Sequence, residues 1–177
     1  SNNLIDIFKI WQGGMSFHGG LIGIIFVSVW FAKKNNHNPF KYLDVIAIVA
    51  PIGIFFGRIA NFINSELYGT ETNLPWAVKF VQVDNLYRHP SQLYEALLEG
   101  LILFLLLMLI FFKKNYRIGT CSCNFLIFYG TFRIFSELFR EPDVQLGYLF
   151  KSLTMGMILS AFMIVLGLIL YRKKNDI

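Results

Sequence analysis

Residues Leu93 to Phe112 read LYEALLEGLILFLLLMLIFF, and from Leu101 onward no polar residue interrupts the run. As an α-helix, these 20 residues are long enough for the hydrocarbon core of a bilayer, which is about 30 Å thick. The segment is therefore predicted to span a membrane. Its first turns contain Glu95 and Glu99, polar residues of a kind that a lipid-embedded helix normally avoids.

The composition of the whole chain agrees with a membrane protein. Of 177 residues, 55% are hydrophobic and 15% are charged, against about 45–50% and 25% in soluble domains. The net charge of +5 comes from short basic clusters beside apolar segments. Because these clusters form no continuous basic stripe, a nucleic-acid partner is not expected, whereas a lipid bilayer is.

Five apolar segments predict an all-α, polytopic membrane helix bundle with about five transmembrane helices. We expect residues 1–177 to form a single integral membrane domain, and the polar start of the chain is not typical of a signal peptide. The predicted helices are Met15 to Ala32, Leu43 to Ile63, Leu93 to Phe112, Asn124 to Phe139 and Leu153 to Tyr171.

Basic residues predict the orientation of these helices. Clusters beginning at Lys33, Lys113 and Arg172 follow the first, third and fifth segments, so the positive-inside rule places those ends in the cytoplasm and the N-terminus outside. The long outer segment Ser65 to Pro90 contains Trp76 to Val83, which favours a small strand or hairpin.

Glycine spacing suggests where helices approach one another. Gly19 and Gly23 are four residues apart, as are Gly53 and Gly57, and this spacing allows two helices to pack closely.

Arginines inside apolar segments are the strongest functional signal. Arg58 and Arg133 each cost at least about 2.5 kcal/mol at bilayer depth and require compensation. Arg58 lies three residues before Asn61, and Arg133 lies four and seven residues before Glu137 and Arg140, so each set is expected to follow one helix face. The topology places both sets in the outer half of the membrane.

These polar stripes leave two interpretations open. Glu137 either neutralises Arg133 and Arg140 in a structural ion pair or leaves a net positive site. With two or three guanidiniums and few nearby acids, we expect an anion site that binds the phosphate of a lipid head group.

The three histidines differ in expected role. His18, flanked by glycines, is either a hydrogen-bonded structural residue or a general base that takes a proton near neutral pH. His89 precedes Pro90 and is expected to cap or orient the third helix, while His37 is expected at the surface.

No metal or cofactor site is predicted. The carboxylates lack metal-ligand spacing, and no nucleotide-binding glycine motif is present. Cys121 and Cys123 are too few for a zinc site and too close for an ordinary bridge, so they are interpreted as free thiols.

Four blocks resemble the bacterial prolipoprotein diacylglyceryl transferase family, in order and in spacing. They are GGMSFHGGLIG (Gly13 to Gly23), GRIANFINSELYGT (Gly57 to Thr70), RHPSQLYEALLEG (Arg88 to Gly100) and YGTFRIFSELFREPD (Tyr129 to Asp143). The resemblance implies an enzyme of the bacterial inner membrane with its active site toward the outer leaflet. Such an enzyme transfers the diacylglyceryl group of phosphatidylglycerol to the lipobox cysteine of a prolipoprotein and releases glycerol phosphate.

The resemblance also implies residue roles. It makes His18, Arg58 and Arg133 catalytic candidates, with Arg58, Asn61, Arg133 and Arg140 binding phosphatidylglycerol. The supporting candidates are Glu66, Glu95, Tyr129 and Glu137. Ser65 and Thr70 differ from the residues usual in the family, and family members carry further N-terminal residues that are expected to be missing here.

An anion or phospholipid transporter is the alternative function, because it too would place arginines at bilayer depth. A structural membrane subunit is a further alternative. The inner halves of the helices are nearly uniformly apolar and no internal repeat is evident, which favours the transferase over the transporter.

Overall fold

The computed structural model describes residues 17–142 and 153–175. The chain divides into two compact units, Ser1–Leu43 and Asp44–Ile177. Each unit is described separately below.

The first unit contains α1 (Phe17–Lys34) and the beginning of α2 (Pro39–Ile63). α1 ends at two lysines, and Asn36 then takes a left-handed conformation with φ of 54°, as is common just after the end of a helix. His37 forms a 2.6 Å hydrogen bond with the hydroxyl of Tyr42 and is exposed, which confirms its predicted surface position.

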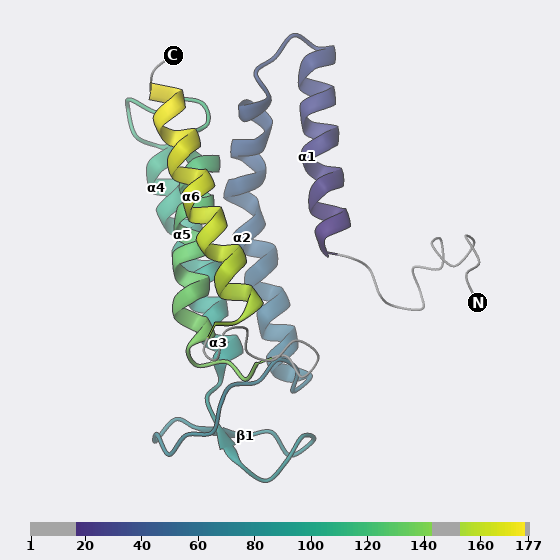
Figure 1. Ribbon diagram of the computed structural model, residues 1–177, viewed down its shortest axis with the longest axis vertical. Helices are drawn as coiled ribbons and strands as arrows, with labels where there is room; N and C mark the ends of the chain where they lie inside the picture. The colour runs from purple at the N-terminus through teal and green to yellow at the C-terminus, as the bar shows by residue number, and fades with distance from the viewer. Residues whose placement is uncertain (1–16, 143–152, 176–177) are drawn as a thin grey trace, which may run out of the picture. The chain divides into compact units, whose positions relative to one another are not determined.

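The second unit contains the remainder of α2 and five further helical elements. α3 (Ser91–Glu95), η3 (Ala96–Ile102) and α4 (Leu103–Phe111) form one continuous helix, in which η3 has the wider hydrogen-bond pattern of a π-helix. Within this unit α4, α5 (Thr120–Glu137) and α6 (Met155–Asn175) run alongside one another (Figure 1).

Three helices are long and apolar enough to cross a membrane, judged by length and composition: Pro39–Ile63, Ser91–Phe111 and Met155–Lys173. The predicted mostly helical membrane fold is confirmed, and helices occur in all five expected places. α1 and α5 are shorter, at 18 residues each, and α5 also carries several polar side chains.

Apolar side chains face outward as well as inward in the second unit. Leu103 and Leu107 are completely buried in a small core with Ile48 and Cys121. On the same helix, Leu101, Leu105 and Leu109 are 43%, 50% and 66% exposed. A stripe of exposed leucines at four-residue spacing fits a surface that contacts lipid.

Asp44 joins α2 to the beginning of α5. Its buried carboxylate accepts hydrogen bonds from the backbone N–H groups of Gly119 and Ser122 and from the hydroxyls of Ser122 and Tyr116. A carboxylate here satisfies N–H groups that have no partner within the helix and complements the positive end of its dipole. Burial and the Asp44 carboxylate raise the pKa of Tyr116, so its phenol stays protonated.

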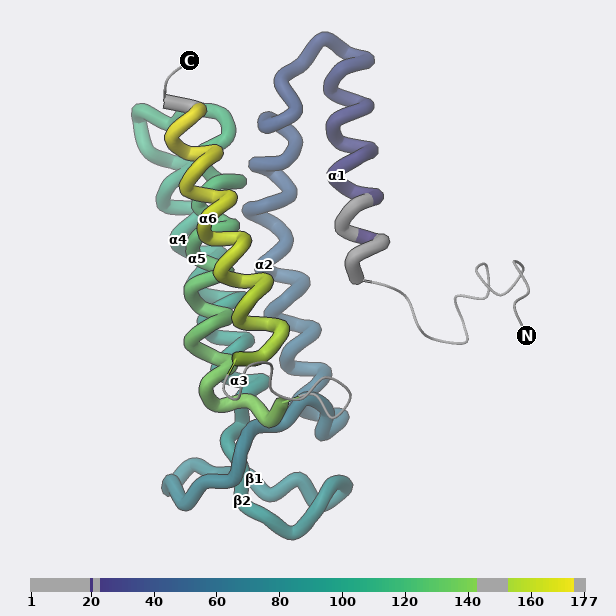
Figure 2. Tube along the Cα trace, in the orientation of Figure 1, coloured from purple at the N-terminus to yellow at the C-terminus, as the bar shows by residue number. Residues whose placement is uncertain are grey.

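The segment between α2 and α3 contains the predicted hairpin, although the strands are short. β1 (Val78–Lys79) pairs in antiparallel register with β2 (Tyr87–Arg88), so only part of Trp76 to Val83 is strand. Figure 2 shows both strands beyond the α3 end of the helices. Gly69 forms a bridge to Arg140, and a Cβ at Gly69 would lie 2.6 Å from the Phe139 carbonyl oxygen, so glycine is required there.

The glycines that bring helices together are not the ones expected. A Cβ added at Gly53 or Gly57 would meet nothing within 4 Å, so neither glycine brings described helices of the second unit together. The same is true of Gly23 within the first unit, and Gly19 lies outside the described side chains. At Gly130, by contrast, a Cβ would lie 2.7 Å from the carbonyl oxygen of Ser160, so glycine lets α5 and α6 touch.

Candidate active site

Arg58 of α2 contacts two buried glutamates of the neighbouring helix. Its Nε lies 2.9 Å from Glu95 Oε2 and its Nη2 lies 3.5 Å from Glu99 Oε2. Both glutamate side chains are completely buried. Close packing makes these contacts possible, because a Cβ at Gly100 would lie 2.7 Å from Phe55 Cβ on α2.

Arg133 of α5 reaches the same two glutamates and a third. Its Nη1 lies 2.6 Å from Glu95 Oε1 and 3.6 Å from Glu99 Oε1, and its Nη2 lies 2.5 Å from Glu137 Oε2. Of the two interpretations left open for Glu137, the structure therefore supports the ion pair with Arg133. Glu95 bridges Arg58 and Arg133, which brings α2 and α5 together at one site.

Arg140 joins this network from outside the helix. The expected helical stripe through Arg140 is wrong, because α5 ends at Glu137 and the chain turns. The bridge between Arg140 and Gly69 holds the turn, and Arg140 Nη1 lies 3.7 Å from Glu95 Oε1. Arg140 thus approaches the site through tertiary structure.

The network is balanced in formal charge, which corrects the expected surplus of positive charge. We name it the arginine–glutamate network, and its members are Arg58, Glu95, Glu99, Arg133, Glu137 and Arg140. A guanidinium removed from water is stable only when paired, and three carboxylates supply the pairs. Two of the carboxylates come from a helix other than those that carry the arginines.

Hydroxyl groups complete the hydrogen bonding of two glutamates. Ser136 donates to Glu99 Oε1 at 3.1 Å, and Thr154 donates to Glu137 Oε1 at 3.0 Å. Neither residue was predicted. Ser136 lies three residues after Arg133, so helical spacing could have placed it on the same helix face as Arg133. Nothing near Thr154 in the sequence indicates its contact with Glu137.

Gln92 also lies in this region and was not predicted. Its Nε2 donates to the backbone carbonyl of Glu66 at 2.7 Å, and its buried Oε1 has no hydrogen-bond partner among the described residues. Gln92 precedes Glu95 by three residues, so the two side chains lie on adjoining parts of one helix face.

Of the remaining predicted residues, Tyr129 lies close enough to the arginine–glutamate network to interact electrostatically with it, whereas Asn61 and Glu66 are placed less centrally. Asn61 is half-buried one turn after Arg58, and Glu66 is exposed. Tyr129 is half-buried one turn before Arg133 and stacks on Phe125, with ring centroids 5.5 Å apart.

The roles expected of His18, Cys121 and Cys123 have different outcomes. His18 lies in α1 of the first unit and its side chain is outside the described residues, so its role stays a prediction. Cys121 and Cys123 are both buried. Among the described residues, no group of three His, Cys, Asp or Glu side chains could hold a metal ion.

A cluster of rings lies at the beginning of α3. Tyr94 OH accepts a 2.8 Å hydrogen bond from Trp76 Nε1 and lies 3.2 Å from His89 Nδ1. The His89 ring also meets Phe139 edge to face. Pro90 occupies the N-cap position without a side-chain hydrogen bond, so the capping role expected of His89 is wrong, and its contact with Tyr94 fits an orienting role. Burial lowers the pKa of His89.

Arg88 fastens the outer segment to the end of α5. It pairs with Asp84 at 2.7 Å and with Glu141 at 3.3 Å, and it donates to the Gly69 carbonyl at 3.1 Å. The hydrogen bond from Arg88 lowers the pKa of Asp84. These contacts fix the segment next to the arginine–glutamate network.

The sequence of this chain matches a known family along almost its whole length. The match is to the family described as prolipoprotein diacylglyceryl transferase and covers residues 1–172. The chain belongs to this family. Several relatives that are about half identical to the chain carry the name of this family.

Three such relatives are named phosphatidylglycerol–prolipoprotein diacylglyceryl transferase. The protein of Rickettsia bellii (strain OSU 85-389) is 53% identical over 176 residues, which is 98% of this chain and 67% of the relative. The protein of a Wolbachia species from Brugia malayi is 50% identical, over 96% of this chain and 66% of the relative. The protein of Aeromonas hydrophila is 52% identical, over 91% and 58%. The chain therefore spans about two thirds or less of these relatives.

Proposed function

We propose that the protein transfers the diacylglyceryl group of phosphatidylglycerol to the lipobox cysteine of a prolipoprotein. The observation that carries this proposal is the arginine–glutamate network, found in a chain of this family. The network concentrates three guanidiniums where α2, α3 and α5 meet, and guanidiniums bind phosphate bidentately.

The reaction exchanges one bond for another at a glyceryl carbon. The cysteine sulfur forms a thioether bond to that carbon, and the bond between the carbon and the phosphate oxygen breaks. Glycerol phosphate leaves with the bonding electrons, and the thiol gives up its proton. The site must therefore stabilise a departing phosphate anion and promote formation of the thiolate.

Arg58 is assigned to bind the phosphate. Its side chain is the most accessible of the three arginines, at 16% exposure against 11% for Arg133 and 8% for Arg140. Because all three are already paired, an incoming phosphate competes with the glutamates for their N–H groups. Arg133, with three carboxylate partners, positions the network and strengthens the field at the departing phosphate. Asn61, one turn after Arg58, is assigned as a further donor to the head group.

His18 is assigned as the group that accepts the thiol proton. A neutral imidazole accepts a proton near neutral pH, whereas the ordinary thiol pKa of about 8.5 leaves little thiolate there. The positive field of the arginines favours the thiolate in the same direction. No metal or cofactor takes part in the proposed reaction.

The site is assigned to the outer leaflet of a bacterial cytoplasmic membrane. The basic clusters at Lys33, Lys113 and Arg172 support cytoplasmic placement of the opposite helix ends. A reporter that is active only in the periplasm, fused after Ile177, is expected to be inactive. Activity of that fusion would contradict the orientation.

The test of function uses the full-length protein in liposomes that contain phosphatidylglycerol and a lipobox peptide. Mass spectrometry of the peptide is expected to detect one added diacylglyceryl group for each glycerol phosphate released. Movement of lipid across the bilayer without a modified peptide would support the transporter and contradict the proposal.

Arg58→Lys tests the assigned phosphate contact. Lysine keeps the charge but lacks the planar pair of donors, and loss of one charge-assisted hydrogen bond of about 1.5–3 kcal/mol predicts about a 10- to 100-fold lower rate. Arg172→Lys, at the exposed end of α6, is the matched control and should keep the parent rate. An Arg58→Lys rate equal to that of the parent would remove Arg58 from the site.

A further inference from the structure

The beginning of α6 packs directly against the Glu137 carboxylate of the arginine–glutamate network. Thr154 Oγ1 donates to Glu137 Oε1 at 3.0 Å, and a Cβ added at Gly156 would lie 2.9 Å from the same oxygen. Thr154 and Glu137 are both buried. The carboxylate is therefore confined between α5, which carries it, and the beginning of α6.

The two neighbours of the Thr154 hydroxyl fix its direction. The hydroxyl oxygen accepts a hydrogen bond from the backbone N–H of Met157 at 3.2 Å, as an N-cap residue does, because the first N–H groups of a helix have no partner within it. The hydroxyl hydrogen is then donated to Glu137, whose ionised carboxylate can only accept. The N-cap of α6 thus holds one oxygen of Glu137.

The other oxygen of Glu137 sets the direction of Arg133. Glu137 Oε2 lies 2.5 Å from Arg133 Nη2, while Arg133 Nη1 lies 2.6 Å from Glu95 Oε1. A guanidinium is rigid and planar, so a displacement at one nitrogen also turns the other. Because Glu95 also pairs with Arg58, a change at the beginning of α6 reaches the arginine assigned to the phosphate.

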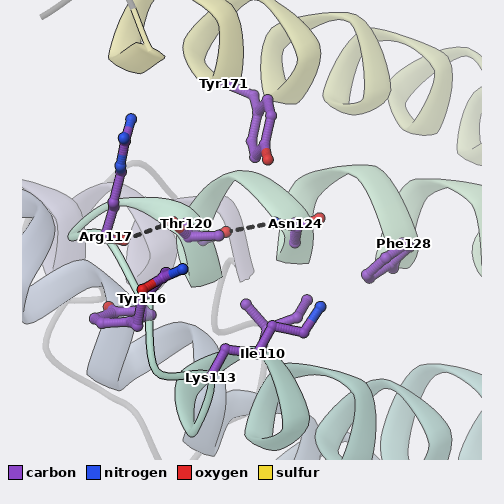
Figure 3. Close-up of a pocket in the computed structure, with 9 residues that line it drawn as sticks. Ile110, Lys113, Tyr116, Arg117, Thr120, Asn124, Phe128 and Tyr171 are labelled. Carbon is purple, nitrogen blue, oxygen red and sulfur yellow. Dashed lines mark hydrogen bonds between the residues drawn. The ribbon is translucent and has the colours of Figure 1, made fainter.

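Glycines bring α6 close enough to α5 for this contact. A Cβ at Gly130 of α5 would lie 2.7 Å from the Ser160 carbonyl oxygen, and one at Gly167 of α6 would lie 2.8 Å from Ile127 Cγ1. Near the other end of the pair, residues of α4, α5 and α6 line a cavity of about 450 Å³, and Figure 3 shows Tyr171 projecting from α6 toward α5 there. The glycine contacts lie between that cavity and the network, and they hold the beginning of α6 against Glu137.

We propose that Thr154 and Gly156 are positioning residues of the candidate active site, which hold Glu137 and, through it, the guanidinium of Arg133. Neither residue touches a reacting group. The inference adds the beginning of α6 to the helices that form the site. Its effect on catalysis rests on the proposed transferase function, whereas the hold on Arg133 does not.

Gly156→Ala and the matched control Gly167→Ala separate positioning from packing. The two glycines lie on the same helix, and an added Cβ would lie 2.9 Å and 2.8 Å from the nearest atom. At Gly156 that atom belongs to the Glu137 carboxylate, which must move by about half an ångström to reach an ordinary contact of 3.4 Å. At Gly167 the Cβ also meets the backbone carbonyl oxygen of Cys123 at 3.0 Å, so the helices themselves must separate.

The first readout is lipidation of a lipobox peptide by the full-length protein. Gly156→Ala is expected to lower kcat about tenfold and to change the KM for phosphatidylglycerol by less than about threefold, because the network is misplaced while Arg58 still binds the phosphate. Gly167→Ala is expected to keep the parental kcat and to lower the free energy of unfolding more than Gly156→Ala does. Thr154→Val should also lower kcat about tenfold, whereas Thr154→Ser keeps the hydroxyl and should retain the parental kcat.

The second readout does not require activity. In NMR spectra of the arginine-labelled protein, the guanidinium N–H signals of Arg133 are identified by their loss in Arg133→Lys. These signals are expected to shift in Gly156→Ala and in Thr154→Val and to stay unchanged in Gly167→Ala. Circular dichroism of each variant verifies that helix content is unchanged.

Three results would overturn the inference. They are parental signals in both Gly156→Ala and Thr154→Val, shifted signals with a parental kcat, and a loss of kcat in Gly167→Ala equal to that in Gly156→Ala. A parent protein that transfers no diacylglyceryl group would overturn the proposed function instead. In that case the NMR signals alone decide whether α6 holds Arg133.

Discussion

Glu95→Gln is expected to destabilise the protein because Glu95 is shared by all three arginines of the network. Its carboxylate lies 2.9 Å from Arg58, 2.6 Å from Arg133 and 3.7 Å from Arg140. Glutamine has nearly the same volume, so the substitution removes charge without leaving a cavity. The network would then contain three guanidiniums and two carboxylates, with one positive charge uncompensated.

The size of the effect follows from the burial of these groups. At an effective dielectric constant of 20, each ion pair at about 4 Å is worth about 4 kcal/mol. The carboxylate loses its hydration in the folded state, which offsets part of that attraction, and removing one partner of a buried pair typically costs about 3–5 kcal/mol. We therefore expect the free energy of unfolding to fall by about 3–5 kcal/mol.

The assay is unfolding by sodium dodecyl sulfate in mixed micelles, followed by circular dichroism. Glu66→Gln is the control, since Glu66 is exposed in the same region and its substitution should change the unfolding free energy by less than about 0.5 kcal/mol. Adding Arg140→Gln to Glu95→Gln rebalances the charges and should recover at least about 1 kcal/mol. A stable Glu95→Gln protein, or a double variant weaker than the single one, would refute the electrostatic account.

Three further predictions concern protons and packing. His18→Gln should impair lipidation strongly near pH 6.5 and recover in part near pH 9, at about which thiolate forms unaided; a loss independent of pH, measured beside the parent, would argue for a positioning role. Burial lowers the pKa of His89 in the folded protein. As pH falls below about 6.5, His89 is therefore protonated in the unfolded chain before it is protonated in the folded one, and the free energy of unfolding should decrease. In His89→Phe the free energy of unfolding should depend less on pH between about 7.5 and 5.5 than in the parent. An unchanged pH dependence would show that His89 is not its cause. Gly130→Ala should lower the free energy of unfolding, measured by thermal unfolding, because its Cβ would lie 2.7 Å from the Ser160 carbonyl oxygen. Gly53→Ala, whose Cβ would meet nothing within 4 Å, should leave the free energy of unfolding unchanged or raise it by up to about 1 kcal/mol through helix propensity. Equal effects of the two alanines would contradict the described packing.

Local sequence was sufficient to predict the helices and the convergence of the polar residues. The apolar segments are as long as a bilayer is thick, and this constraint acts on each segment independently of its neighbours. For the same reason, the cost of an arginine at bilayer depth identified Arg58 and Arg133 without knowledge of their partners. The contact of Arg133 with Glu137 follows from helical spacing alone.

Tertiary structure decided the charge of the site. Glu95 is 37 residues from Arg58 and 38 from Arg133 along the chain, and periodicity within one helix carries no information on such pairs. Arg140 does not lie on the expected helix face because α5 ends at Glu137. The bridge from Arg140 to Gly69 forms only when the outer segment is folded, so helical spacing could not predict it.

Packing between helices was also decided by the fold. Gly53 and Gly57 have the spacing of a helix contact and face open space in the described structure, whereas Gly130 has no such motif and touches α6. Asp44 likewise fastens α2 to α5 across 75 residues of chain, through its bond to the Gly119 N–H. The sequence by itself determines which segments enter the membrane, because hydrophobicity is a property of each segment. Which side chains compensate one another depends on the relative rotation of the helices, and only packing in three dimensions determines that rotation.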